Sequence, residues 1–259
     1  MKLLKIDLKD FLEEKYDKYN RISFIESDPI CIPHQFTQKE DIEIAGFLAA
    51  TIAWGQRVTI INNANKMMKL MGNNPHDFIM SAKKKDVSRF DNFVHRTFNG
   101  IDAAFFIKSI QNIYKNHGGL QNAFSPNSNV KSDHTLEAIM NFRKIFFSIE
   151  HPYRTGKHVS NPSENSSAKR LCMYLRWMVR NDNQGVDFGI WKTSLLPSHL
   201  MCPLDVHSGN VARKLGLLKR TQNDWKAVEE LTGNLKKFDA KDPVKYDFAL
   251  FGLGVFEKF

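Results

Sequence analysis

The chain has 259 residues, of which 42% are hydrophobic and 12% aromatic, so it can bury a substantial core and is not intrinsically disordered. Its 37 Lys and Arg residues outnumber 28 Asp and Glu residues and give a net charge of +9. This excess favours a polyanionic partner, either nucleic acid or a membrane surface, with a merely basic soluble protein as the alternative.

The cysteine content and the N-terminal segment indicate a compartment. The three cysteines, Cys31, Cys172 and Cys202, form no CxxC motif, which argues against a disulfide framework, a zinc site or an iron–sulfur cluster. The N-terminal segment has charges between its apolar residues, unlike a signal peptide, and no run approaches the roughly 20 apolar residues of a membrane span. We therefore expect a cytoplasmic protein.

The spacing of apolar residues is helical along most of the chain, and no segment alternates strongly enough to predict a strand. The predicted helices before residue 150 are 8–16, 41–54, 58–71, 75–81, 101–114 and 136–147. Segment 125–133 is rich in Pro, Asn and Ser and segment 151–167 is irregular, so both are predicted as loops.

These elements predict an all-α fold. We expect one globular unit, 1–259, with two approximate subdomains. Residues 41–150 would form a helical bundle and 151–220 a hairpin-like region, with 1–40 and 221–259 packed on them.

Two predicted helix starts in the second half of the chain carry candidate chemistry. Lys169 opens an amphipathic helix, and Asp205 follows Pro203 at the expected N-cap of the next helix. They are 36 residues apart, so only a helix–turn–helix return of the chain would bring them together. A lysine and a carboxylate at facing helix starts form a candidate amine nucleophile and its partner. The alternative is a surface lysine beside an ordinary helix cap.

The helix after Lys169 carries further cations. Lys169, Arg176 and Arg180 recur at helical spacing and should share one face. Like charges on one face repel each other unless an anion lies across them, and a phosphate backbone would meet that need. A solvated basic stripe is the alternative. His207, in the first turn after Asp205, is more often a hydrogen-bonding residue than a catalytic one, and a lone histidine gives no metal signal.

The order of these motifs carries a family resemblance. Lys169-Arg170-Leu171, followed by Pro203-Leu204-Asp205-Val206-His207, resembles the helix-hairpin-helix (HhH-GPD) DNA glycosylase superfamily, in which a hairpin lysine precedes a V-D-x-H element. The superfamily hairpin usually reads L-P-G-V-G-x-K, whereas residues 161–169 read NPSENSSAK. Residues 47–71 resemble the early helix pair whose junction reaches into DNA. The wider sequence, including 175–180 and 245–254, is similar to the DUF2400 family of bacterial proteins of unknown function.

The glycosylase resemblance implies two helical subdomains with a cleft, and a base-excision reaction on a damaged base such as an oxidised purine. Lys169 would attack the sugar C1′ and form a Schiff base, while Asp205 would help to deprotonate it and would stabilise positive charge on the sugar. No metal or organic cofactor is implied, and the implied partner is nucleic acid, as double-stranded DNA. The expected nucleic-acid-binding residues are Trp54, Gln56, Arg57, Ser166, Ser167, Arg176, Arg180, His207 and Arg213.

Two other functions stay open at this point. One is a non-catalytic nucleic-acid-binding protein on the same scaffold, in which Lys169 and the arginines only hold phosphate. The other is an α-helical protein-interaction module whose positive charge is incidental.

Overall fold

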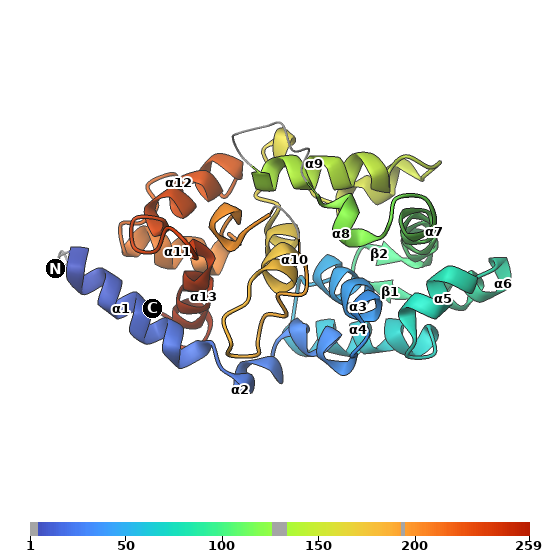
Figure 1. Cartoon of the computed structure of the whole chain (residues 1–259), viewed down its shortest axis with the longest axis horizontal. Coiled ribbons are helices and arrows are strands. Elements are labelled where there is room, and N and C mark those ends of the chain that lie inside the picture. Colours follow the sequence, from blue (N-terminus) through green and yellow to red (C-terminus); the bar gives the residue numbers. More distant parts are fainter. Residues whose placement is uncertain (1–4, 126–133, 193–194) are drawn as a thin grey trace. The chain divides into compact units, whose positions relative to one another are not determined.

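A computed structural model describes residues 5–125, 134–192 and 195–259 (Figure 1). The chain divides into two compact units, each of which is described by itself. The first contains the described residues up to Phe24, the pair His134 and Thr135, and Asn161–Phe259. The second contains the described residues of Ile25–Lys131 and Leu136–Ser160. The expected loop at 125–133 lies outside the described residues except for Ser125.

The first unit is built from helices of widely separated parts of the chain. Its helices are α1 (Lys5–Tyr19), α10 (Lys169–Val179), α11 (Val206–Lys214), α12 (Trp225–Leu235) and α13 (Tyr246–Val255), with 3-10 turns at Pro162–Glu164, Pro197–His199 and Pro243–Lys245. The predicted inner stripe of α10, Leu171, Leu175 and Met178, is buried. The four-residue helix α2 (Ile22–Ile25) follows α1.

Helices α1 and α13 pack closely against each other in this unit. The rings of Tyr19 and Phe256 stack with centroids 5.5 Å apart. Gly252 faces the ring of Tyr19 so closely that a Cβ there would clash with it. The approach therefore depends on the missing side chain of this glycine. Phe24, after α1, adds an edge contact to Phe248, with ring centroids 5.3 Å apart.

The second unit is a helical bundle with a phenylalanine core. Its elements are α3 (Lys39–Thr51), α4 (Arg57–Leu70), α5 (Pro75–Ser81), α6 (Lys84–Val87), α7 (Gly100–Asn116), α8 (Leu120–Ala123) and α9 (His134–Phe146) from Leu136 on, with 3-10 turns at Pro29–Cys31, Pro33–Gln35, Ser88–Phe90 and Tyr153–His158. Phe106 lies 4.8 Å from Phe146 and 5.8 Å from Phe47 between ring centroids. Each such pair adds about 1 kcal/mol beyond the burial of its area.

The all-α prediction is confirmed, with one small addition. A two-stranded antiparallel sheet, β1 (Val94–His95) and β2 (Phe98–Asn99), precedes α7. Each strand has two residues, too few for an alternating pattern to appear in the sequence. Its tight turn contains Arg96 at φ 54° instead of the Asn-Gly or Asp-Gly that usually marks a hairpin.

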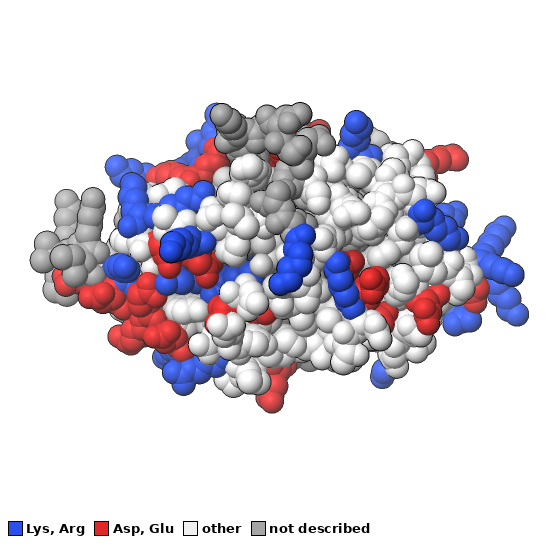
Figure 2. All heavy atoms as spheres, in the orientation of Figure 1, with Lys and Arg blue, Asp and Glu red and all other residues white. Residues whose placement is uncertain are grey.

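The six helices predicted before residue 150 correspond to α1, α3, α4, α5, α7 and α9, with ends that differ by a few residues. The charge excess does not gather into one patch on the face drawn in Figure 2, where acidic and basic side chains are interspersed over the first unit. Basic side chains also gather at the end of the second unit that carries α6, where Lys83, Lys84 and Lys85 are exposed.

Candidate functional site

Lys169 and Asp205 lie together in the first unit, as the sequence predicted. Lys169 Nζ is 3.5 Å from Asp205 Oδ2, and the two side chains are 25% and 28% exposed. Both side chains therefore remain accessible from solvent while they face each other. A partly exposed amine beside a carboxylate is a candidate nucleophile with its partner.

Asp205 is fixed by the helix that it caps. Its Oδ1 accepts hydrogen bonds from the backbone N–H groups of His207 at 2.9 Å and Ser208 at 3.0 Å. In return, the backbone N–H of Asp205 donates to Ser208 Oγ at 3.0 Å, which completes a capping box. The predicted N-cap is confirmed. One carboxylate oxygen holds α11, and the other is left to face Lys169.

Short polar contacts tie the two helix starts to each other. Ser167 Oγ donates a hydrogen bond to the carbonyl of Leu204 at 3.1 Å, which joins the residue next to Asp205 to the segment before Lys169. Ser166 Oγ accepts from the backbone N–H of Ala168 at 3.2 Å. The two serines thus have a positional role in the structure.

The residue before Lys169 has a strained backbone. Ala168 adopts φ 46° and ψ 32°, the left-handed region, and is fully buried. An L-residue with a Cβ pays roughly 1 kcal/mol there. Such strain persists only where the surroundings impose it, and here it sets the direction in which α10 begins.

Electrostatics favour the ionised form of Asp205. Burial raises its pKa, but the charge of Lys169, the N–H of Ser208 and the charge and N–H of His207 lower the pKa by more, so that it lies below its ordinary value. Asp205 is therefore a carboxylate at neutral pH and a fixed negative charge beside Lys169.

A second carboxylate of the first unit interacts with this pair through its charge. Asp247, in the first turn of α13, is 7% exposed and forms an ion pair with Arg176 Nη1. Burial raises the pKa of Asp247 to about 6, although the charges of Arg176 and Lys169 lower it. The charges of Asp205 and Asp187 raise it further. This carboxyl group therefore interacts electrostatically with both members of the Lys169–Asp205 pair.

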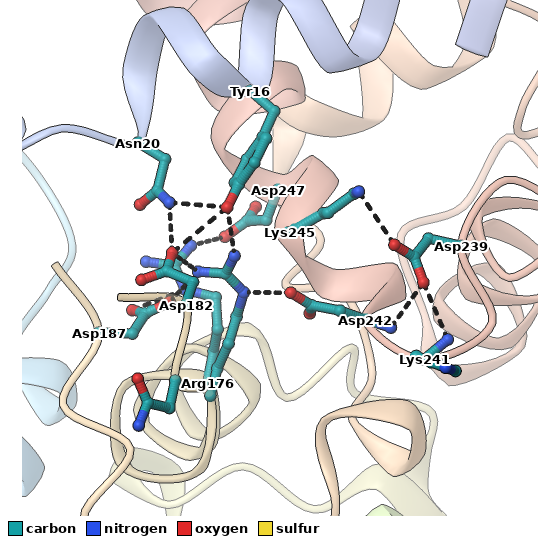
Figure 3. Close-up of polar contacts among 12 residues, drawn as sticks. Tyr16, Asn20, Arg176, Asp182, Asp187, Asp239, Lys241, Asp242, Lys245 and Asp247 are labelled. Carbon is teal, nitrogen blue, oxygen red and sulfur yellow. Dashed lines mark hydrogen bonds and ion pairs between the residues drawn. The ribbon is translucent and has the colours of Figure 1, made fainter. Parts of the chain in front are cut away.

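The predicted basic face is wrong for Arg176 of α10 and for Arg180, which directly follows this helix. Arg176 is 4% exposed and Arg180 0% exposed, and both lie in a network of carboxylates (Figure 3). Arg180 contacts Asp187 at 2.9 Å and Asp242 at 2.8 Å. It also forms an ion pair with Asp182 and donates to the hydroxyl of Tyr16 at 2.9 Å.

Arg176 joins the same network through Asp187, with its Nε 3.2 Å from Oδ1. The anions that lie across this face are thus aspartates of the protein itself. Arg176 and Arg180 therefore neither face a phosphate backbone nor form a solvated stripe, so both predictions for these two arginines are wrong. We name the set Arg176, Arg180, Asp182, Asp187, Asp242 and Asp247 the buried ion network.

A family model matches residues 28–256 of the chain. The chain belongs to the DUF2400 family. The family is described as proteins of unknown function, and no curated protein and no solved structure matches the chain. The part of this DUF2400 protein that the model matches includes Lys169, Asp205 and the whole buried ion network, but not Tyr16 of α1.

Two further residues of the first unit that were predicted to bind nucleic acid, His207 and Arg213, differ in exposure. His207 is exposed beside Asp205. Arg213 is half-buried, with Nε donating to the carbonyl of Arg220 at 2.8 Å and Nη2 donating to Asn223 Oδ1 at 2.7 Å. Its guanidinium is therefore partly committed to contacts within this DUF2400 protein.

Three predicted nucleic-acid residues lie in the second unit, between α3 and α4. Trp54 is half-buried, stacks on His158 with centroids 5.9 Å apart and meets His95 edge-on at 5.2 Å. Gln56 is exposed, and Arg57 is the half-buried first residue of α4. Trp54 is thus held from two sides, whereas Gln56 has the more accessible side chain.

Sequence reasoning missed Asp247. A signal was present, because Asp247 is the lone charged residue in the run YDFALFGLGV of α13. A single acid in an otherwise apolar helix points to a buried partner. Across the described residues, no group of three or more His, Cys, Asp and Glu side chains is arranged to hold a metal ion. Within the same residues, no helix has the length and apolar character of a membrane span.

Proposed function

We propose that this protein is a DNA glycosylase and AP lyase that removes a damaged base, such as an oxidised purine, through a Schiff base on Lys169. The observation that carries the proposal is the 3.5 Å approach of Lys169 Nζ to Asp205 Oδ2 at the starts of two helices. The order of lysine, helix, Pro-Leu-Asp-Val-His and helix along the chain supports it as well.

The hairpin geometry also supports this function. Asn165 has φ 64° and stands four residues before Lys169, at the position of the first glycine in the superfamily pattern. Asn is among the residues that tolerate this left-handed conformation best after glycine. Ser167 stands at the second glycine, is small, and binds the backbone next to Asp205. Asn165 thus provides the left-handed backbone, and Ser167 the small side chain, that the two glycines would provide.

The reaction would begin with Lys169 as a neutral amine. Nζ forms a bond to C1′ of the sugar, and the bond from C1′ to the base breaks with its electron pair leaving on the base, which takes a proton from the new ammonium nitrogen. The C1′–O4′ bond then opens, O4′ takes a proton from solvent, and a protonated imine remains. Loss of a C2′ proton expels the 3′-phosphate. Asp205, fixed and ionised, stabilises the positive charge on the sugar.

Nucleic acid is the proposed partner, as double-stranded DNA from which the base is flipped at a cost of a few kcal/mol. The residues proposed to contact it are Trp54, Gln56, Arg57, Ser166, Ser167, His207 and Arg213. Arg176 and Arg180 are withdrawn from this set because they are buried. Gln56 has the most exposed side chain of the Trp54–Arg57 segment, which would fill the gap left by a flipped base.

Borohydride trapping on a panel of lesion-bearing duplexes tests the proposal. The wild-type protein should form a covalent complex with at least one lesion, and Lys169→Gln should form none while it still binds the duplex. Lys226→Gln, which removes an exposed lysine of α12, is the matched control and should trap normally. Absence of a covalent complex across the panel would overturn the proposal.

A non-catalytic DNA-binding role is the second candidate, favoured by the replacement of both hairpin glycines. It predicts salt-dependent binding to undamaged duplex without any trapping, because neutralised phosphates release counterions. Trapping that depends on Lys169 would exclude this role as the complete function.

A further inference from the structure

Three segments of the second unit meet at the turn of the β1–β2 hairpin. The turn lies against the α3–α4 junction, because Arg96 Nη1 is 3.0 Å from the position that a Cβ on Gly55 would occupy. The same turn is bound by Arg154, whose Nη2 donates a hydrogen bond to the carbonyl of Thr97 at 2.9 Å. Arg154 belongs to the 3-10 helix Tyr153–His158. The junction, the turn and this 3-10 helix are therefore held together by direct contacts.

These segments carry positive charge and no acidic residue. They read WGQR at 54–57, RT at 96–97 and YRTGKH at 153–158, and we name them the hairpin surface. Their exposed side chains include those of Gln56, Arg96, Tyr153 and Lys157. Asp102, which pairs with Arg154 at 2.7 Å, is completely buried below them. The hairpin surface therefore presents cations to solvent and no carboxylate of its own.

Arg96 has a strained backbone and no partner for its charge. Its φ of 54° lies in the left-handed region, which costs a residue with a Cβ some stability and which glycine and asparagine adopt more readily. Among the residues that the structure describes, no carboxylate or carbonyl group binds the guanidinium of Arg96 or the ammonium of Lys157. Strain at an exposed residue without a stabilising polar contact directs attention to a ligand outside the chain.

We propose that the hairpin surface binds the phosphate backbone of double-stranded DNA, with Arg96 and Lys157 as its principal contacts. A guanidinium donates to phosphate oxygens in fixed directions, and an ammonium acts on them as a point charge. Tyr153, which is 99% exposed, adds a hydroxyl group that donates to a phosphate oxygen. This inference rests on the nucleic-acid partner of the proposed function, but it does not require the chemistry of Lys169.

The charge of the hairpin surface suits a duplex. Double-stranded DNA carries one negative charge per about 1.7 Å of its axis, so that two neighbouring cations engage separate phosphates. Contacts to the backbone hold DNA without reading its sequence. Gly55, which Arg96 approaches, is next to Gln56, so a backbone held by Arg96 would lie beside the residue proposed to fill the gap of a flipped base.

Salt-dependent binding of the whole protein to an undamaged duplex, measured by fluorescence anisotropy, tests the hairpin surface. Arg96→Asn combined with Lys157→Gln removes both charges, and Asn suits the left-handed backbone at position 96. This double variant should bind at least about tenfold more weakly at 0.1 M salt. Its salt slope should flatten by about two units, one for each lost phosphate contact.

Three further variants sharpen the measurement. Arg96→Lys combined with Lys157→Arg keeps both charges and should keep the salt slope. Tyr153→Phe removes a neutral donor, so binding should weaken severalfold with an unchanged slope. Lys108→Gln combined with Lys115→Gln is the matched control, since it removes two exposed lysines of α7 in the same unit and should change affinity by less than about twofold. Thermal unfolding should be the same for all variants, because every exchanged side chain is exposed.

The possible results separate this proposal from the glycosylase function. An Arg96→Asn, Lys157→Gln variant with wild-type affinity and slope, or one that loses no more than the α7 control, overturns the role of the hairpin surface and leaves Lys169 trapping unaffected. Tighter binding of the wild type to a single strand of the same sequence overturns the duplex as its partner. A wild type that binds duplex through Arg96 and Lys157 but traps on no lesion overturns the glycosylase function and leaves the hairpin surface.

Discussion

The cation at the start of α10 and the cation directly after its end differ in burial and in the number of carboxylates that they contact. Lys169, at its start, is 25% exposed and faces one carboxylate at 3.5 Å. Arg180, directly after its end, is 0% exposed and contacts Asp182, Asp187 and Asp242. Both residues are cations at helical spacing, and the sequence predicts one shared role for them.

The difference lies in the number of acids that other segments bring to each end. Three carboxylates and a tyrosine hydroxyl around Arg180 satisfy the planar guanidinium, which carries five N–H donors in fixed directions. A single carboxylate beside Lys169 leaves a compact ammonium partly open to solvent. A cation enclosed by several acids holds the fold together, whereas a cation with one partner and an open side remains available for chemistry.

Arg180→Met should have the largest effect on stability. It leaves the buried carboxylate of Asp187 and the partly buried one of Asp242 without the charge of Arg180, so the free energy of unfolding should fall by about 3–5 kcal/mol. Urea denaturation measures this loss. Arg220→Met is the matched control, because Arg220 pairs with Asp224 close to solvent in the same unit, so that this substitution should lower the free energy of unfolding far less. Equal losses in the two variants would contradict the contrast drawn here.

The network should also give stability a distinct pH dependence. Burial raises the pKa of Asp247 to about 6 from an ordinary value of 3.8, so the folded state holds an extra proton between these values. The stabilising contribution of this group is present below pH 3.8 and is lost as pH rises through 6. The free energy of unfolding of the wild type relative to Asp247→Asn should therefore fall by about 3 kcal/mol from pH 3 to pH 7. A constant difference across this range would place Asp247 in a polar environment.

Asp205→Asn should lower the reaction rate at the start of α10 and leave the stability of the fold nearly unchanged. Loss of the negative charge should slow turnover by about 100-fold, which corresponds to about 2.7 kcal/mol of activation free energy. Stability should change by less than about 1 kcal/mol, because Asn caps helices as well as Asp does. Single-turnover rates and thermal unfolding measure the two quantities. A large loss of stability with an unchanged rate would give Asp205 a purely structural role.

The smallest expected effect concerns the strain before Lys169. Ala168→Gly should raise the free energy of unfolding by up to about 1 kcal/mol, because glycine adopts the left-handed conformation without strain. Ala212→Gly, at a buried position inside α11, should lower it by about 1 kcal/mol. Unfolding curves that shift in the same direction for both variants would contradict the assignment of strain to Ala168.

The sequence predicted local features well and distant partners poorly. Helix periods, the cap at Asp205 and the approach of Lys169 depend on short patterns and on one motif order, and these were confirmed. The burial of Arg176 depends on its ion pair with Asp247, which lies 71 residues further along the chain. Helical spacing tells which residues share a face, but it does not tell what packs against that face. The hairpin at β1 and β2 was missed because its strands are too short to show a period.

The division of the chain has a consequence for how the protein is made. All residues of the second unit belong to the stretch that ends at Ser160, whereas α1 belongs with Asn161–Phe259. Helix α1 therefore leaves the ribosome early, whereas the residues that it contacts, among them Arg180, Asp182 and those of α13, are synthesised only after the second unit. Asp247 arrives on α13, so the surroundings of Lys169 are assembled last. The Lys169–Asp205 pair therefore forms only after translation has passed the second unit.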